Sequence, residues 1–291
     1  MTKQTTKQTA KQTAKQTAKQ LILVTGGTGK TGSRVVSRLR ERGTPVRVAS
    51  RSGEQPFDWH DRTTWDAALE GVTAVYLVPL DGELLTRPFV ERAAELGVER
   101  VVLLSGRGVD TPEQADVTGP SHLDGENAVR AGGLAWTILR PDWFTQNFDE
   151  GFFRDAVLAG ELRLPLGDAA AAYVDAEDIA AVAVAALTED GHTGQTYDLS
   201  GPRALTMAQA AAEISRATGR DIRYVPLSPE EFVAELAGQG WPAADAEFYA
   251  KALGPVRQGL NSHISDGVPR ALGRPARDFT DYAQATAGAW R

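Results

Sequence analysis

The chain has 291 residues, of which 42% are hydrophobic, so it can bury the core of one large domain or two small ones. It has no cysteine and only four histidines, none of them at ligand spacing, which excludes disulfides, thiol nucleophiles and thiolate zinc sites, and we expect no metal. The net charge of −7 hides five lysines in residues 1–20; the other 271 residues carry 26 basic and 38 acidic side chains, about −12, so we expect no nucleic-acid partner.

Residues 3–20 repeat Lys-Gln-Thr-Ala with a period of four. A helix would stack these lysines at i, i+4, where like charges repel, and almost no side chain here could enter a core. We therefore expect residues 1–20 to be a tag or a disordered extension, with an arm for nucleic acid or an anionic surface as the alternative. No apolar run is long enough to cross a membrane or follows the lysines as a secretory signal would. We expect a cytoplasmic protein with no membrane partner.

From Leu21 onward, short apolar runs alternate with amphipathic stretches, which predicts a parallel, doubly wound α/β sheet of the Rossmann type with its ligand at the carboxyl ends of the strands. The expected strands are Leu21–Thr25, Val46–Ser50, Ala74–Val78, Val101–Ser105, Ala135–Leu139 and a strand near Thr196–Leu199. The expected helices between them include Thr31–Glu41, Leu84–Leu96 and Asp175–Leu187.

The pattern changes after Gly201 to helices with clear start signals. Thr206 with Gln209 and Ser228 with Glu231 are capping-box arrangements. We expect residues 21–200 to form the cofactor-binding domain and residues 201–291 a smaller, mainly helical cap that binds a small-molecule substrate. Monomer and homodimer both stay open.

A glycine-rich turn follows the first strand. Gly26, Gly29 and Gly32 have the G-x-x-G-x-x-G spacing of short-chain-dehydrogenase-like folds, in which the turn approaches a pyrophosphate and a helix N-terminus offers free N–H groups. A P-loop would need a glycine where Val24 stands, which argues against an NTPase. Lys30 either neutralises cofactor phosphate or is a solvated side chain on the first helical turn.

The end of the second strand indicates which dinucleotide is bound. An NAD-specific site carries Asp or Glu here, whereas this chain has Arg51 and Ser52, a cation and a hydroxyl that suit the 2′-phosphate of NADP. Asp58 and Trp59 lie where such folds place an Asp beside the adenine. Trp59 either stacks on that ring or packs in the protein.

The usual catalytic pair of short-chain dehydrogenases, Tyr-x-x-x-Lys, does not occur, because neither Lys30 nor Lys251 has a tyrosine four residues before it. Ser105 could occupy the catalytic serine position. His122 could donate a proton, with Glu126 one helical turn later holding its ring, or both could be solvent-facing or capping residues. Hydride transfer to an iminium needs no proton, so the missing acid points to a cationic or otherwise electrophilic substrate.

Several segments together resemble the NmrA-like atypical short-chain dehydrogenases, and some of them resemble the festuclavine and agroclavine dehydrogenase group in particular. These segments are Thr25–Gly32, Val48–Ser52, Phe57–Trp59, Ala74–Pro79, Val102–Ser105, Ile138–Phe148 and Val174–Ala180. The resemblance covers residues 21 to about 230. It implies NADPH-dependent reduction, although the family also contains quinone and azo-dye reductases and regulators that sense NADP without turnover.

The resemblance also implies roles for individual residues. Those expected to bind NADPH are Gly26, Thr28, Gly29, Lys30 and Thr31 at the pyrophosphate, Arg51 and Ser52 at the 2′-phosphate, Asp58 and Trp59 at the adenine, and Val78, Pro79 and Ser105 at the ribose and nicotinamide. Those expected in the substrate wall are Trp143, Phe144, Asn147 and Phe148, whereas Asp175 and Asp178 are expected to cap a helix.

The sequence therefore predicts an NADPH-dependent reductase that transfers hydride to an imine, an iminium or a conjugated carbonyl. A quinone or azo reductase of the same family is the first alternative. A non-catalytic NADP-sensing regulator is the second, because it would need the same glycine turn and Arg51 but no productive pocket.

Overall fold

The structure is a computed structural model that describes residues 20–51 and 53–291, and only the backbone of residues 112–119. The expected extension, apart from Gln20, and Ser52 lie outside the described residues. Gln20 itself donates a side-chain hydrogen bond to the Leu187 carbonyl.

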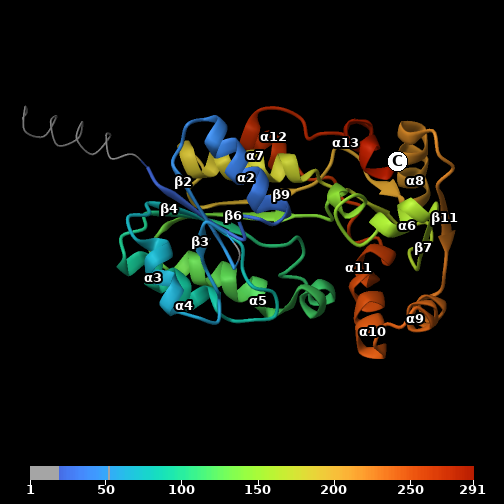
Figure 1. Ribbon diagram of the computed structural model, residues 1–291, viewed down its shortest axis with the longest axis horizontal. Helices are drawn as coiled ribbons and strands as arrows, with labels where there is room; N and C mark the ends of the chain where they lie inside the picture. Colours follow the sequence, from blue (N-terminus) through green and yellow to red (C-terminus); the bar gives the residue numbers. More distant parts are fainter. Residues whose placement is uncertain (1–19, 52) are drawn as a thin grey trace, which may run out of the picture.

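A seven-stranded parallel sheet forms the centre of the molecule, in the order β3-β2-β1-β4-β5-β6-β9 (Figure 1). Chain order reverses between β1 and β4, which opens a crevice at the carboxyl ends of the strands. The expected Rossmann-type sheet is confirmed. Its strands are β1 (Ile22–Thr25), β2 (Val46–Ser50), β3 (Gln55–Pro56), β4 (Ala74–Leu77), β5 (Arg100–Leu104), β6 (Ala135–Pro141) and β9 (Gln195–Leu199).

Helices cover both faces of this sheet (Figure 1). On one face lie α2 (Lys30–Glu41), α7 (Ala176–Thr188) and α12 (Gly267–Leu272), and on the other α3 (Thr63–Leu69), α4 (Thr86–Glu95) and α5 (Pro112–Ala131). Helix α7 packs against both α2 and α12, and its residues 178–187 are all buried, which explains why alanine and valine dominate its sequence. Amphipathic α2 instead buries one stripe, including Val35, Val36 and Leu39.

Thr25 joins the two strands that flank the crevice. Its hydroxyl accepts a hydrogen bond from the backbone N–H of Val78 at 2.8 Å and lies 3.3 Å from the Tyr76 carbonyl. These contacts hold the end of β4 beside the end of β1, where the glycine turn begins. A hydroxyl at the end of an otherwise apolar strand therefore positions the site.

The remaining elements form a second lobe with its own hydrophobic core. They are η1 (Thr145–Asn147), α6 (Arg154–Ala159), β7 (Glu161–Leu164), β8 (Ala170–Ala171), β10 (Leu205–Thr206), α8 (Met207–Thr218), β11 (Arg223–Pro226), α9 (Pro229–Gly238), α10 (Ala243–Ala252), α11 (Gly254–Arg257), α13 (Phe279–Thr286) and η2 (Ala287–Trp290). Strands β8 and β10 pair antiparallel and β7 and β11 pair parallel. Both expected capping boxes are present, at the starts of α8 and α9.

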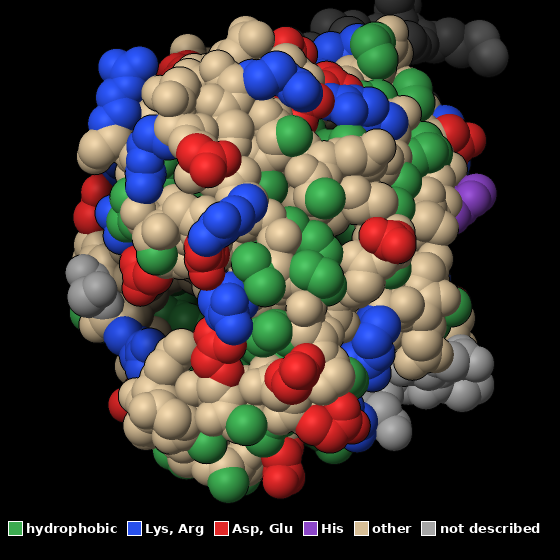
Figure 2. All heavy atoms as spheres, turned by 90° about the vertical axis from the view of Figure 1, so that its right-hand side faces the viewer, with side chains coloured by type: hydrophobic (Ala, Val, Ile, Leu, Met, Phe, Trp, Pro, Cys, Tyr) green, Lys and Arg blue, Asp and Glu red, His purple; other side chains and the backbone are tan. Residues whose placement is uncertain are grey.

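This cap differs in extent from residues 201–291. Its core also takes in Phe148 and residues 153–173, which leave the sheet after β6, whereas α12 returns to pack on β9 and α7. Figure 2, which looks onto the cap end of the molecule, shows acidic and basic side chains interspersed over this face. Within the described residues, no helix is long and apolar enough to span a membrane, and no group of three or more His, Asp or Glu could hold a metal ion.

Candidate active site

The turn between β1 and α2 forms a cradle for an anion. Gly26 has a φ of +60°, and a Cβ on Gly32 would lie 2.2 Å from the Gly26 carbonyl oxygen, so both positions need glycine. Gly29 is the N-cap of α2, and among the described residues no side chain caps the helix and no acid lies in its first turn. The free N–H groups and the positive end of the helix dipole therefore fit the pyrophosphate of a dinucleotide.

A cavity of about 600 Å³ lies over this turn, at the carboxyl edge of the sheet. It is lined by Gly26, Thr28, Gly29, Lys30, Thr31, Ser50, Arg51, Phe57, Asp58, Trp59, His60, Val78, Leu80, Leu104 and Phe144. Of the described residues expected to bind the cofactor, only Pro79 and Ser105 are outside this wall. Pro79 is buried, and Ser105 lines the neighbouring cavity.

The part of the first cavity beside the end of β2, where the sequence predicts the adenine, carries an exposed cation and an aromatic wall. Arg51 stands exposed at the end of β2. Trp59 packs edge-on against Phe57 and Phe89, with ring centroids 5.2 and 5.3 Å away, and also lines the cavity. Trp59 therefore both packs in the protein and lines the cavity. The Asp58 carboxylate accepts the backbone N–H of His60 at 2.9 Å, which stabilises the turn that presents Trp59.

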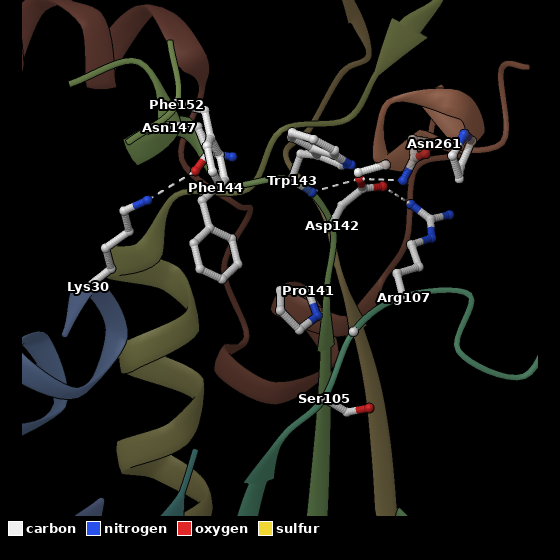
Figure 3. Close-up of a pocket in the computed structure, with 13 residues that line it drawn as sticks. Lys30, Ser105, Arg107, Pro141, Asp142, Trp143, Phe144, Asn147, Phe152 and Asn261 are labelled. Carbon is white, nitrogen blue, oxygen red and sulfur yellow. Dashed lines mark hydrogen bonds and ion pairs between the residues drawn. The ribbon is translucent and has the colours of Figure 1, made fainter. Parts of the chain in front are cut away.

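A second cavity, of about 350 Å³, lies between the ends of β5 and β6 and the cap (Figure 3). It is lined by Lys30, Ser105, Gly106, Arg107, Pro141, Asp142, Trp143, Phe144, Asn147, Phe152, Ala252, Pro255 and Asn261. Lys30 and Phe144 belong to the walls of both cavities. A molecule in the second cavity therefore lies next to one in the first.

Of the four residues expected in the substrate wall, three line this second cavity: Trp143, Phe144 and Asn147. Trp143 stacks on Phe153 at a centroid distance of 6.0 Å, which fixes its ring. Phe148 instead lies fully buried in the cap core, beside Tyr173 and Phe279, and is not in the wall.

Lys30 reaches from the phosphate turn into the junction of the two cavities. Its ammonium donates to Asn147 Oδ1 at 3.2 Å and lies 5.8 Å from the centroid of the Phe152 ring. Burial lowers the pKa of Lys30, while the negative charges of Glu150 and Asp149 oppose that shift. The side chain is thus a built part of the site rather than a solvated one.

The other end of the second cavity holds a polar network that the sequence did not indicate (Figure 3). The Asp142 carboxylate accepts hydrogen bonds from Arg107 Nη1 at 2.8 Å, from Asn261 Nδ2 at 2.8 Å and from the Trp143 backbone N–H at 2.7 Å. Burial raises the pKa of Asp142 to about 6, although the N–H of Trp143 and the charge of Arg107 both act to lower it. Two signals in the sequence could have pointed to this network: Asp142 lies within the segment Ile138–Phe148 that carries the family resemblance, and Arg107 lies two residues after Ser105.

Ser105 lines the same cavity but is not paired with His122. Its hydroxyl donates to Glu126 Oε1 at 2.7 Å, and Arg140 donates to both Glu126 oxygens at 2.7 Å. Burial raises the pKa of Glu126, but the hydrogen bonds from Arg140 and Ser105 and the charge of Arg130 outweigh it and the pKa is lowered. An ionised Glu126 holds the Ser105 proton, so Ser105 presents lone pairs to the cavity.

His122 is on α5 but in the wall of neither cavity. Its Nε2 lies 3.6 Å from Asp81 Oδ1. The expectation that Glu126 holds the His122 ring is corrected by the contacts of Glu126 with Ser105, Arg140 and Arg130. His122 and Glu126 do lie one turn apart on α5. The buried Glu126 carboxylate, however, pairs with the guanidinium groups of Arg140 and Arg130. Proton donation by His122 stays a prediction.

Asp175 and Asp178 act at the start of α7, as the sequence favoured. The Asp175 carboxylate caps the helix by accepting the Glu177 N–H at 2.8 Å. Asp178 is buried and binds the Arg274 guanidinium and the Arg277 backbone N–H, which anchors the C-terminal segment to α7.

Comparison with known proteins agrees with this geometry. The NAD(P)H-binding family matches residues 26–190. The chain is 37% identical to the NAD(P)H azoreductase of Xenophilus azovorans, over 93% of this chain and 99% of the relative, and 32% identical to the agroclavine dehydrogenase of Claviceps fusiformis, over 92% and 99%. The NADPH complex of the Escherichia coli quinone oxidoreductase QOR2 has the same fold, with a TM-score of 0.77 at 24% identity over 91% and 99% of the two chains.

The expected resemblance to NmrA-like short-chain dehydrogenases is confirmed, and the azoreductase shares more identity with this chain than the agroclavine dehydrogenase does. The glycine turn and the exposed Arg51 line the first cavity, and the second cavity adjoins it at Lys30 and Phe144. The chain therefore belongs to the NAD(P)H-binding family and is an NAD(P)H-dependent oxidoreductase.

Proposed function

We propose that this enzyme uses NADPH to reduce a flat, conjugated acceptor bound in the 350 Å³ cavity. The observation that carries the proposal is the shared wall: Lys30 and Phe144 line both cavities, so cofactor and acceptor would lie in contact. NADPH, when bound, supplies a hydride from its nicotinamide ring. The protein supplies the phosphate cradle at one end, and Trp143 and Phe144 as flat walls at the other.

Charge in the second cavity favours one class of acceptor. Its described lining holds two cationic side chains, Lys30 and Arg107, and one acid, Asp142, which is already paired with Arg107. A cationic iminium would meet the ammonium of Lys30 in the lining, whose nearby acids Glu150 and Asp149 lie outside that lining, whereas an azo compound, quinone or conjugated carbonyl would meet no such repulsion. The azoreductase relative supports the same choice. We therefore rank these acceptors above the iminium, which remains the competing candidate.

The acceptor class is tested by following NADPH absorbance with azo dyes, quinones, conjugated carbonyl compounds and a cyclic iminium salt. We expect kcat/KM for at least one uncharged conjugated acceptor to exceed that for the iminium. Turnover confined to the iminium would reverse the ranking. Turnover of none of them, with NADPH still bound, would favour the sensing role instead.

Preference for NADPH over NADH rests on Arg51, which is exposed in the cofactor wall at the end of β2. Replacing Arg51→Ala removes a charge-assisted contact worth about 1.5–3 kcal/mol, so the Kd for NADPH should rise roughly 10- to 100-fold and that for NADH should change little. Fluorescence titration measures both. Arg154→Ala, at an exposed site on the cap, is the matched control and should alter neither Kd. Equal losses for the two cofactors would contradict the assignment.

A further inference from the structure

Arg107 has a fixed end and a free end. Its Nη1 donates to Asp142 Oδ2 at 2.8 Å and to the His263 carbonyl oxygen at 2.7 Å. Within the described residues, no protein acceptor contacts Nε or Nη2, and neither atom is buried without a partner. The side chain is 11% exposed and lines the 350 Å³ cavity, in the wall that this cavity shares with a smaller hollow. Arg107 therefore keeps N–H donors that no described protein acceptor uses, on a side chain that lines both hollows.

The other polar side chains that line the 350 Å³ cavity differ from Arg107 in what they can offer a ligand. Ser105 gives its proton to Glu126 and can only accept, and the Asp142 carboxylate is an acceptor too. Lys30 extends from the phosphate turn and donates to Asn147, so it lies at the cofactor junction. Arg107 is the cation next to the ends of β5 and β6, where its backbone N–H donates a hydrogen bond to the Pro141 carbonyl at 3.0 Å.

We propose that Arg107 stabilises the negative charge that hydride transfer creates on the acceptor, in place of the missing Tyr-Lys pair. This inference rests on the proposed function. Hydride adds to one atom of the conjugated system, the π bond breaks, and its electron pair passes to the distal oxygen or nitrogen. The guanidinium binds that anion and keeps its own proton, because arginine does not act as an acid. Solvent then supplies the proton that completes the reduced product, and the nicotinamide leaves oxidised.

Asp142 and Asn261 are positioning residues in this arrangement. The carboxylate fixes one edge of the guanidinium, and the Asn261 amide and the Trp143 N–H fix the carboxylate. Fixed donors stabilise a developing charge better than mobile ones, because they need no rearrangement during the reaction. The network therefore explains why a buried ion pair lines an otherwise largely apolar and aromatic cavity.

Arg107→Ala tests the charge-stabilising role in the NADPH-bound enzyme. With an uncharged quinone or azo acceptor, kcat should fall about 10²- to 10³-fold, the loss typical of removing one anion-stabilising donor, while KM changes a few-fold. Added guanidinium ion should restore part of the kcat of Arg107→Ala. The kcat of Arg107→Lys should lie between those of Arg107→Ala and the native enzyme. Arg154→Ala is again the control and should keep full activity. A rise in KM with unchanged kcat would show that Arg107 only binds the substrate and would overturn the proposal.

A binding measurement separates this proposal from the proposed function. The probe is 4-nitrophenolate, a flat anion, titrated into the enzyme–NADP⁺ complex, with neutral 4-nitroanisole as its matched control. Arg107→Ala should weaken phenolate binding at least 10-fold and leave the Kd for 4-nitroanisole and NADPH unchanged. Equal loss for both probes, or none, would overturn the role of Arg107. Failure of the native enzyme to reduce any conjugated acceptor would instead remove the proposed function, whatever the phenolate result.

Discussion

Among single residues, Asp142 determines how the second cavity responds to pH. The groups with charge or protons that face it are Arg107 and the buried phenol of Tyr173, whose pKa burial raises, so the phenol stays neutral. Because burial raises the pKa of Asp142 to about 6, acidification through pH 6 protonates the carboxyl and releases Arg107. We expect kcat/KM for an uncharged conjugated acceptor to fall below pH 6. Asp142→Asn should be less active and should not show this fall in kcat/KM below pH 6. A pH profile of the variant with the same fall would contradict the assignment of that fall to Asp142.

The same carboxyl should also leave a signature in stability. Its folded pKa of about 6 lies above the reference value of 3.8, so the folded state binds the proton more tightly and this group's contribution falls as pH rises from about 4 to 6. When the pH is lowered from 7.5 to 5, the free energy of unfolding of the native chain should therefore rise by about 1 kcal/mol relative to that of Asp142→Asn. Urea unfolding of both proteins at the two pH values measures this difference. A difference of the opposite sign would mean that the pKa is lowered in the fold.

At the scale of elements, the approach of α2 to the β1 turn requires Gly32. A methyl group there would lie 2.2 Å from the Gly26 carbonyl oxygen, so Gly32→Ala must push the helix away from the turn. We expect roughly 2 kcal/mol or more of lost stability and at least a 10-fold weaker NADPH complex. Thermal melts and cofactor titration provide both numbers. Gly238→Ala, at the end of α9 with no atom within 4 Å of the added Cβ, should be neutral or stabilising.

The elements could be predicted from sequence wherever their signals are local. Six of the seven strands of the sheet, α2, the glycine turn and both capping boxes depend on neighbouring residues, and they lie within a few residues of their expected bounds, whereas the two-residue edge strand β3 was not expected. The cap could not be delimited in this way, because Phe148 and several side chains between Phe153 and Tyr173 share one core with segments after residue 205, far along the chain.

Most of the proposed acceptor site was also beyond prediction, for a physical reason. Arg107 and Asp142 are 35 positions apart, and Asn261 is 119 positions beyond Asp142, so only tertiary packing brings them together. Helical spacing correctly placed His122 and Glu126 near each other. It could not reveal that Arg140, on β6, takes the carboxylate. The cofactor wall was easier, because the turn and the strand ends follow from topology.

For the molecule as a whole, two lobes meet at the second cavity, the proposed acceptor site. The sheet lobe supplies nearly all of the cofactor wall, while Asn147, Phe152, Ala252, Pro255 and Asn261 close the second cavity from the cap side. A cofactor bound in the first cavity would border the second one at Phe144 and Lys30, which line both. Cofactor binding is therefore expected to create part of the acceptor site.

This arrangement predicts an ordered, sequential reaction in which NADPH binds first. Direct hydride transfer needs both cavities filled at once, so double-reciprocal plots of initial rate against either substrate should intersect. Because NADPH completes the acceptor site, 4-nitrophenolate should inhibit competitively against the acceptor and uncompetitively against NADPH. Competition between phenolate and NADPH would mean that the anion occupies the phosphate cradle, with Lys30 rather than Arg107 as its partner. Parallel plots would show that the two cavities do not act together, contrary to the wall they share through Lys30 and Phe144.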